Sequence, residues 1–259
     1  MEREDKVKTT DQTDHKRRDF LKTGVAASAV TLAPGIVMHT AEAAPRDKAV
    51  DSSVRWGMLV DTFKCASGCD SCVQACNEEN GLEAYSMPEG ADPEKWDQQR
   101  PKWMRNVTLK DNLSGRISNL PLMCQHCENP PCADVCPTGA SFRRADGIVM
   151  VDRHTCIGCR YCMMACPYKA RSFIHENVDI KPELAPRGKG CVESCNFCVH
   201  RLDDGETSTA CQDACPENAI IFGDLNDPNS EVSKALAEYP SVQIRADLRL
   251  NTGVRYSGI

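Results

Sequence analysis

The sequence predicts an α+β fold of two modules, with loop insertions and an extended C-terminal tail. The first observation is that 17 of the 259 residues are cysteines, most of them in regularly spaced groups. The second is that aromatic residues supply only 5% of the chain and hydrophobic residues 41%. Such a composition provides little bulky apolar material for a core. We therefore expect cross-links through cysteine to hold part of the fold.

The charge balance excludes several classes of function. Lys and Arg number 31 against 37 Asp and Glu, which gives a formal net charge of −6. An acidic chain without a basic surface is not typical of nucleic-acid-binding proteins. The odd number of cysteines also means that they cannot all pair in intramolecular disulfides.

Residues 1–43 have the organisation of a twin-arginine export signal. Arg17 and Arg18 precede the uncharged stretch 23–38, and Ala41-Glu42-Ala43 offers a cleavage site before Ala44. The stretch is short for a membrane span, which needs about 20 residues. The alternatives are a soluble basic helix and an uncleaved anchor. Because this export route carries folded proteins, we expect a periplasmic protein whose thiols are already committed to a cofactor.

Sixteen of the cysteines fall into four groups of four. The third group, C-x2-C-x2-C-x3-C-P, matches the bacterial run that binds [4Fe-4S] clusters. The second and fourth lengthen the middle loop, and the first has one extra residue at its start and ends in Asn77 instead of proline. The groups are Cys65, Cys69, Cys72, Cys76; Cys124, Cys127, Cys132, Cys136; Cys156, Cys159, Cys162, Cys166; and Cys195, Cys198, Cys211, Cys215.

Zinc and disulfides are the alternative uses of these thiols. Zinc is held by two separated C-x2-C pairs, which leaves the third cysteine and the Cys-Pro ending of each group unexplained. Disulfides between such close neighbours close loops too short to contribute much stability. Cys191 lies outside the groups and is expected to be a free buried thiol, although it could replace a ligand in the fourth group.

In the bacterial run the fourth cysteine of one group binds the cluster of another group. The sequence therefore predicts four [4Fe-4S] clusters in two ferredoxin-like modules. The inner module covers 121–184, and the outer module covers 44–120 and 185–259 with the C-terminal tail. The predicted ligand sets are quartet A (Cys65, Cys69, Cys72, Cys215), quartet B (Cys195, Cys198, Cys211, Cys76), quartet C (Cys124, Cys127, Cys132, Cys166) and quartet D (Cys156, Cys159, Cys162, Cys136).

Local patterns predict the elements around these groups. Residues 140–152 predict two short strands joined at Asp146-Gly147, a favoured hairpin dipeptide. Asp92 followed by proline predicts a helix start, and Ser230 predicts a helix that runs to about residue 239. Each C-x3-C ending is expected on a short helix, and 242–259 is expected to be an extended tail docked on the body or on a partner.

The residues near the cysteines suggest an electron carrier without a catalytic site. Lys64, Arg160, Lys169 and Arg171 are candidate cations beside buried thiolates, or else solvated surface residues. The histidines near ligands (His126, His154, His175, His200) are expected to be structural or exposed, because every quartet is complete. We find no nucleotide-binding glycine motif, P-loop or C-x-x-C-H haem motif. Transfer of single electrons between partners is the function that remains.

Several segments carry a resemblance to a known family. The stretches CQHCENPPCADVCPTGA, DGIVMVDRHTCIGCRYCMMACPYKAR and FGDLNDPNSEVSKAL are similar to the four-cluster ferredoxin subunits of membrane-bound oxidoreductases, over 54 to about 239. RWGMLVD, CASGCDSC, the export signal and GVRYSGI resemble the DsrO subunits of sulfite-reduction-associated DsrMKJOP complexes. The sixteen cysteines are the residues carried over, and the extra residue in group one makes Cys65 the ligand that departs from the wider pattern.

The resemblance implies a set of partners. These are a quinone-interacting membrane subunit of the NrfD or polysulfide-reductase type, a multihaem cytochrome c and the other DsrMKJOP subunits, at the outer face of the cytoplasmic membrane. An alternative is the electron-transfer subunit of a periplasmic molybdopterin enzyme such as tetrathionate or polysulfide reductase. A zinc-stabilised secreted binding module is an alternative of a different class. Iron and sulfide content distinguishes it from the electron carriers.

Overall fold

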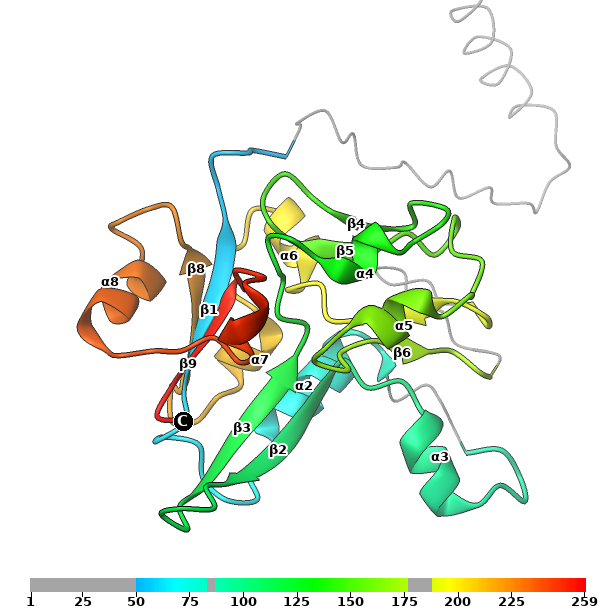
Figure 1. Cartoon of the computed structure of the whole chain (residues 1–259), viewed down its shortest axis with the longest axis horizontal. Helices are drawn as coiled ribbons and strands as arrows, with labels where there is room; N and C mark the ends of the chain where they lie inside the picture. The colour runs from blue at the N-terminus through cyan, green and yellow to red at the C-terminus, as the bar shows by residue number, and fades with distance from the viewer. Residues whose placement is uncertain (1–49, 83–86, 177–187) are drawn as a thin grey trace, which may run out of the picture. The chain divides into compact units, whose positions relative to one another are not determined.

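A computed structural model describes residues 50–82, 87–176 and 188–259. The predicted export signal lies outside these residues. Residues 50–259 form one compact unit, within which the predicted division into two modules stays a prediction. The chain combines short helices with short strands, as expected for an α+β fold (Figure 1).

A three-stranded sheet joins three parts of the chain that are distant in sequence (Figure 1). The central strand β1 (Trp56–Asp61) pairs antiparallel with β8 (Ile220–Asp224) and parallel with β9 (Val254–Ser257). Helix α8 (Glu231–Glu238) covers β8 and β1, where Val232 packs against Leu59. Its predicted cap is confirmed, because the Ser230 hydroxyl accepts a hydrogen bond from the Ser233 N–H at 3.2 Å.

The predicted extended tail is only partly extended. It contains a 3-10 helix at Ala246–Leu248 before it enters the sheet as β9. Val254 and Tyr256 alternate toward the core and are fully buried, so the apolar alternation has become an integral strand. The Tyr256 hydroxyl donates to the Pro121 carbonyl at 3.0 Å and so ties β9 to a second sheet.

The second sheet is a long hairpin that the sequence analysis did not predict. Strand β2 (Met104–Lys110) pairs with β3 (Ile117–Met123) over seven residues on each strand. Only its base is buried, which leaves no regular apolar alternation for a sequence pattern to detect. Helix α2 (Ser71–Glu79) packs beside β2. Asp92 caps α3 (Pro93–Gln99) as predicted, because its carboxylate accepts a hydrogen bond from the Glu94 N–H at 2.9 Å.

The inner part of the chain consists of short elements. Strands β4 (Ser141–Arg143) and β5 (Val149–Val151) form the predicted hairpin around Asp146-Gly147, and β6 (Ser172–Phe173) pairs with β7 (Val192–Glu193). The helices at the C-x3-C endings are confirmed: each begins close to the third cysteine of its group. Besides α2 they are α4 (Pro131–Asp134), α5 (Tyr161–Ala165) and α7 (Ala210–Asp213), and α6 (Val199–Asp203) follows Cys198.

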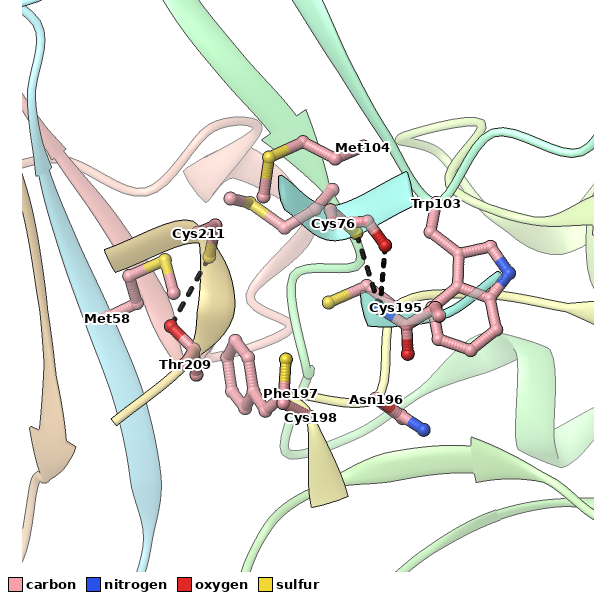
Figure 2. A pocket seen from close by; sticks show the side chains of 12 residues that line it. Met58, Cys76, Trp103, Met104, Cys195, Asn196, Phe197, Cys198, Thr209 and Cys211 are labelled. Atoms are coloured by element: carbon pink, nitrogen blue, oxygen red, sulfur yellow. Dashed lines mark hydrogen bonds between the residues drawn. The ribbon is translucent and has the colours of Figure 1, made fainter. Parts of the chain in front are cut away.

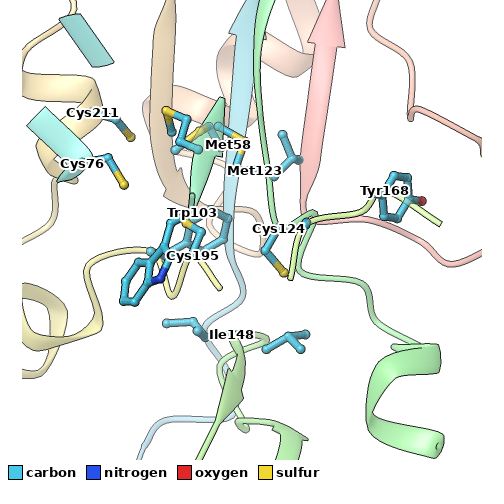
Figure 3. Packing of buried hydrophobic residues seen from close by; sticks show 14 of the residues in the cluster. Met58, Cys76, Trp103, Met123, Cys124, Ile148, Tyr168, Cys195 and Cys211 are labelled. Atoms are coloured by element: carbon cyan, nitrogen blue, oxygen red, sulfur yellow. The ribbon is translucent and has the colours of Figure 1, made fainter. Parts of the chain in front are cut away.

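Cysteines make up a large share of the buried core. Cys76, Cys124 and Cys195 pack with Met58 and Trp103 in one cluster that runs through the molecule (Figure 3). Aliphatic and aromatic residues form the rest of the cluster, so the expectation that cysteine cross-links hold part of the fold stays a prediction.

Candidate metal centres

The four cysteine groups share one backbone turn. In each group the residue before the second cysteine has a positive φ: 80° at Gly68, 44° at His126, 72° at Gly158 and 56° at Phe197. This left-handed conformation is favourable for glycine and costs energy for histidine and phenylalanine. It turns successive N–H groups toward one side, an arrangement that favours anions. The shared turn shows that the groups are structural repeats even where their spacing differs.

A second repeat follows the fourth cysteine. In groups two, three and four the fourth cysteine is followed by proline, and the second residue after this proline has a positive φ. These residues are Gly139, Lys169 and Asn218. The chain then turns back, and the Ala219 N–H donates to the Cys215 sulfur at 3.2 Å. The Ser141 N–H donates in the same way to Cys136 at 3.4 Å. Group one lacks the proline, and α2 continues there to Glu79.

The cysteines of quartets A and D line one cavity each. The four thiols predicted as quartet A surround a cavity together with Lys64 and Pro216. Those predicted as quartet D surround another, together with Arg160 and Val192. In each case three cysteines come from one group and the fourth comes from a different group, as the ligand exchange requires.

The thiols of quartet B meet in the interior. Cys76, Cys195, Cys198 and Cys211 line a cavity that Met58, Trp103 and Phe197 close (Figure 2). The four sulfurs come from α2, from the turn before α6 and from α7. Segments 119 residues apart in sequence, from Cys76 to Cys195, therefore meet at one site.

Quartet C is defined by electrostatic contacts between its thiols. Burial raises the pKa of Cys124, and Arg171 opposes this rise. The thiols of Cys132 and Cys166 add to it, so that the pKa reaches about 12. Burial, followed by the thiols of Cys124, Cys132 and Cys166, raises the pKa of Cys127 to about 12. The structure thus brings together all four predicted sets, while the assignment of each thiol as a ligand stays a prediction.

Protonated thiols dominate these sites near neutral pH when no metal compensates their burial. Burial, followed by neighbouring thiols, raises the pKa of Cys65 to about 11 and that of Cys72 to about 12. Cys136 is an exception: burial raises its pKa, but hydrogen bonds from the Ser141 N–H and the Thr138 hydroxyl leave it below its ordinary value. Binding of a metal centre by these thiols is therefore expected to release protons.

The donor set fits clusters better than single ions. Among the described residues, no three His, Cys, Asp or Glu side chains converge closely enough to hold one metal ion. Thiolates at the corners of a four-iron cubane lie farther apart than the ligands of one tetrahedral zinc. The buried Arg171 Nη1 also has no hydrogen-bond partner, although it lies beside quartet C. These features favour iron-sulfur clusters over the zinc alternative.

The four predicted cations have different environments. Arg171 is buried, and its Nη2 donates to the Cys132 sulfur at 3.0 Å. Lys64 forms an ion pair with Asp61 at 3.9 Å at the edge of the quartet A cavity. The Arg160 guanidinium lies 3.8 Å above the Phe173 ring beside quartet D. Lys169 supplies the left-handed turn and lines a basic cleft.

The histidines serve structural roles where the structure shows contacts. His126 is buried, and its Nδ1 accepts the Val149 N–H at 3.0 Å. Burial, with a smaller effect from Arg171, lowers the pKa of His126 to about 3 and keeps its ring neutral. His200 Nε2 lies 2.6 Å from a Glu79 carboxylate oxygen.

Cys191 lies outside the four cavities. Its sulfur donates to the Arg153 carbonyl at 3.2 Å, and the side chain is partly rather than fully buried. The structure contains no disulfide at any of the 17 cysteines. The prediction of a free, buried thiol is therefore confirmed in part: Cys191 is free, but its burial is incomplete.

The sequence analysis missed two polar neighbours of the thiols. Asn80 Nδ2 lies 3.7 Å from the Cys76 sulfur and donates to the Cys76 carbonyl at 2.9 Å. The Thr209 hydroxyl lies 3.3 Å from the Cys211 sulfur. A polar residue two to four positions from a cysteine is the only sequence signal for such contacts, and it is too common to single out a pair.

Comparisons with known proteins agree with this chemistry. Residues 116–225 match a 4Fe-4S dicluster domain. The chain is 39% identical over 271 residues to an Hdr-like menaquinol oxidoreductase iron-sulfur subunit 1 of Archaeoglobus fulgidus, covering 93% of this chain and 97% of that protein. The chain belongs to the family of iron-sulfur electron-transfer subunits of oxidoreductase complexes.

Two further relatives support the same family. A tetrathionate reductase subunit of Salmonella typhimurium is 36% identical over 233 residues, with 87% of this chain and 80% of that protein covered. Protein NrfC of Escherichia coli is 36% identical over 239 residues, with 90% of each chain covered. Such subunits transfer electrons and do not themselves carry the catalytic site. No helix among the described residues has the length and apolarity needed to cross a bilayer.

Proposed function

We propose that this chain is a DsrO-type electron-transfer subunit that holds four [4Fe-4S] clusters, one in each of quartets A to D. In this proposal it relays electrons between a quinone-interacting membrane subunit and the other redox subunits of a sulfur-metabolism complex. When bound, clusters of this type take up and release single electrons. The residues of the chain set the spacing, burial and charge around them.

The arrangement of the quartets in a series is the observation that carries the proposal. Helix α2 holds Cys72 of quartet A and Cys76 of quartet B four residues apart. Cys195 of quartet B interacts electrostatically with Cys124 of quartet C. Helices α4 and α5, which pack on each other, carry Cys132 of quartet C and Cys162 of quartet D. The order A, B, C, D forms a continuous path.

The two ends of this series reach the surface. Cys159 of quartet D is exposed, and the side chains around it include the exposed Ile157, Tyr161 and Met164. At the other end Cys65 and Cys69 are partly exposed, next to Phe63, which is 71% exposed. All four thiols of quartet B and all four of quartet C are buried. Exposed ends and a buried middle suit a carrier that exchanges electrons with two partners.

Different observations support the proposed location and the proposed partners. The twin-arginine pattern supports export in folded form to the periplasmic face of the cytoplasmic membrane. The relative described as a menaquinol oxidoreductase subunit supports a quinone-linked membrane partner of the NrfD or polysulfide-reductase type. The resemblance to DsrO supports a multihaem cytochrome c and the other DsrMKJOP subunits as further partners.

A second candidate is the electron-transfer subunit of a periplasmic molybdopterin reductase. The similarity to the tetrathionate reductase protein of Salmonella typhimurium favours it specifically. Isolation of the native complex under anaerobic conditions separates the candidates: a haem-containing partner supports the first, and a molybdenum-containing partner supports the second.

Metal analysis tests the cluster content itself. Four clusters require about sixteen iron and about sixteen acid-labile sulfide per chain. The reduced protein should show four titratable EPR signals. Zinc bound in place of iron, or a stable colourless protein after anaerobic preparation, would contradict the proposal. For the location, replacement of Arg17 and Arg18 by lysine should keep the chain in the cytoplasm, and unchanged export would contradict that part.

A further inference from the structure

The guanidinium of Arg171 lies between two of the cysteine quartets. Its Nη2 donates to the Cys132 sulfur of quartet C at 3.0 Å. The same charge interacts with Cys124 of quartet C and with Cys162 of quartet D. The charge of this one side chain therefore acts on thiols of both quartets.

Burial makes this charge effective. Arg171 is only 5% exposed, so little water screens its interaction with the neighbouring sulfurs. The groups that stabilise its charge are thiols. Burial lowers the pKa of Arg171, but this effect is outweighed by Cys132, Cys124 and Cys162, which raise the pKa above its ordinary value. A buried arginine that faces sulfur requires negative charge there to offset the cost of its desolvation.

The local backbone fixes the position of Arg171. The left-handed turn at Lys169 reverses the chain after Cys166-Pro167, and Ala170 is buried. At the next residue, the Ser172 hydroxyl accepts from the Lys102 N–H at 2.9 Å and donates to the Lys102 carbonyl at 2.8 Å. Arg171 is thus held between two anchored positions at the start of β6.

Quartets A and B have different cationic neighbours. Lys64, at the edge of quartet A, pairs with Asp61. Arg201, near quartet B, is engaged by Glu79 and Asp213. Carboxylates oppose both of these charges, whereas the charge of Arg171 faces sulfur. The effect of Arg171 should therefore be concentrated on one half of the series.

We propose that Arg171 is a positioning residue that raises the reduction potentials of the clusters in quartets C and D, and of C more than D. This inference rests on the proposed function. Reduction adds negative charge to a cluster, and a buried cation that donates to a ligand sulfur stabilises the reduced form. Quartet C receives both the hydrogen bond and the charge, and quartet D receives the charge.

Potentiometric EPR on the anaerobically purified full chain tests the inference with two substitutions. Arg171→Gln removes the charge, and Arg171→Lys keeps it. Arg171→Gln should lower the reduction potentials of two of the four clusters that EPR detects, one of them by at least about 59 mV. For a one-electron couple, a shift of about 59 mV changes the ratio of reduced to oxidised cluster tenfold at a fixed potential. Arg171→Lys should restore part of the shift. Unchanged potentials, or an equal shift of all four, would overturn the inference.

Arg144→Gln is the matched control. Arg144 is also shielded from solvent, but its partners are the carboxylates of Asp146 and Asp203, so its loss should leave the four potentials unchanged. If Arg171→Gln fails to assemble, wild-type protein with 15N-labelled arginine gives a second measurement. Pulsed EPR should detect a guanidinium nitrogen coupled to one cluster, and its absence would equally overturn the inference. A wild-type protein without iron would contradict the proposed function instead.

Discussion

The rings of His126 and Phe197 stack with their centroids 3.6 Å apart. Each residue precedes the second cysteine of its group and adopts the same left-handed conformation. His126 lies in the turn of quartet C and Phe197 in the turn of quartet B. The contact between the two middle quartets is therefore built from equivalent positions of two repeats, and it holds the inner and outer cysteine groups together.

Removal of the Phe197 ring should destabilise this contact. Phe197 is 1% exposed, and truncation of a buried phenylalanine to alanine costs about 3–5 kcal/mol. We expect Phe197→Ala to lower the free energy of unfolding by that amount in anaerobic urea titrations. The control is Phe142→Ala, because Phe142 lies on β4 and is much more exposed. Equal losses in the two variants would contradict the role of the stack.

Two glycines at equivalent positions should respond differently to substitution. A Cβ at Gly158 would lie 2.2 Å from the Gly190 carbonyl oxygen, whereas at Gly68 nothing lies within 4 Å of it. Both have a positive φ. Gly68→Ala should cost about 1–2 kcal/mol from backbone strain alone. Gly158→Ala should cost more and should also remove the EPR signal assigned to quartet D. A retained signal would contradict the predicted clash.

This difference illustrates what the sequence could and could not predict. The spacing of the cysteines predicted which thiols meet, because the turn and helix of each repeat are local. The capped helices and the Asp146-Gly147 hairpin were predicted for the same reason. The identity of the contact at Gly158 was not, since Gly190 is 32 residues away and belongs to no pattern.

Long-range pairing also escaped the sequence analysis. The parallel pairing of β9 with β1 joins distant segments that no local periodicity encodes, and the β2–β3 hairpin lacks a regular apolar alternation. Arg171 was one of four candidate cations, and only its burial and its contact with Cys132 distinguish it from the others. The spacing thus indicates which cysteines come together but not what surrounds them, and their assignment as ligands stays a prediction.

Glu79 should contribute a pH-dependent part of the stability. Its carboxylate accepts from Arg201 Nε and Nη2, each at 2.6 Å, and so joins α2 to α6. Hydrogen bonds from Arg201, opposed by burial and assisted by His200, lower the pKa of Glu79 to about 2. Because this pKa lies below the ordinary value of 4.5, the contribution is complete above about pH 4.5 and is lost as the pH falls toward 2.

Glu79→Gln tests this linkage. The variant should be less stable than the wild type by about 1 kcal/mol, since the group is partly solvent-screened. In anaerobic urea titrations the difference should be constant from pH 8 to about pH 5.5 and should decrease below pH 4.5. A difference that increases on acidification would contradict the assigned direction. Asp97→Asn, which breaks exposed pairs with Arg100 and Lys102, is the control and should change stability little.

Substitution of two nearby cysteines tests the ligand register. Cys159 lines the cavity of quartet D, whereas Cys191 donates to a backbone carbonyl. Cys159→Ser should alter or remove one EPR signal and reduce the iron content, while Cys191→Ser should leave all four signals. Loss of a signal after Cys191→Ser would contradict the ligand register.

Removal of iron should unfold the chain. The buried cysteines form part of the central core cluster, and without a metal their burial leaves protonated thiols in place of bonded cross-links. Chelation under anaerobic reducing conditions should abolish the near-UV circular dichroism and expose all 17 thiols to a labelling reagent. A chain that keeps its tertiary signal after iron is lost would show that side-chain packing is sufficient.

Helix α2 carries Cys72 and Cys76 on successive turns, and the two thiols belong to different quartets. The pitch of a helix, about 5.4 Å, is invariant under mutation of most of its surface residues. In the proposed electron carrier, helix geometry rather than loop length therefore sets the spacing between the ligands of quartets A and B. A longer loop elsewhere in the chain would leave this spacing unchanged.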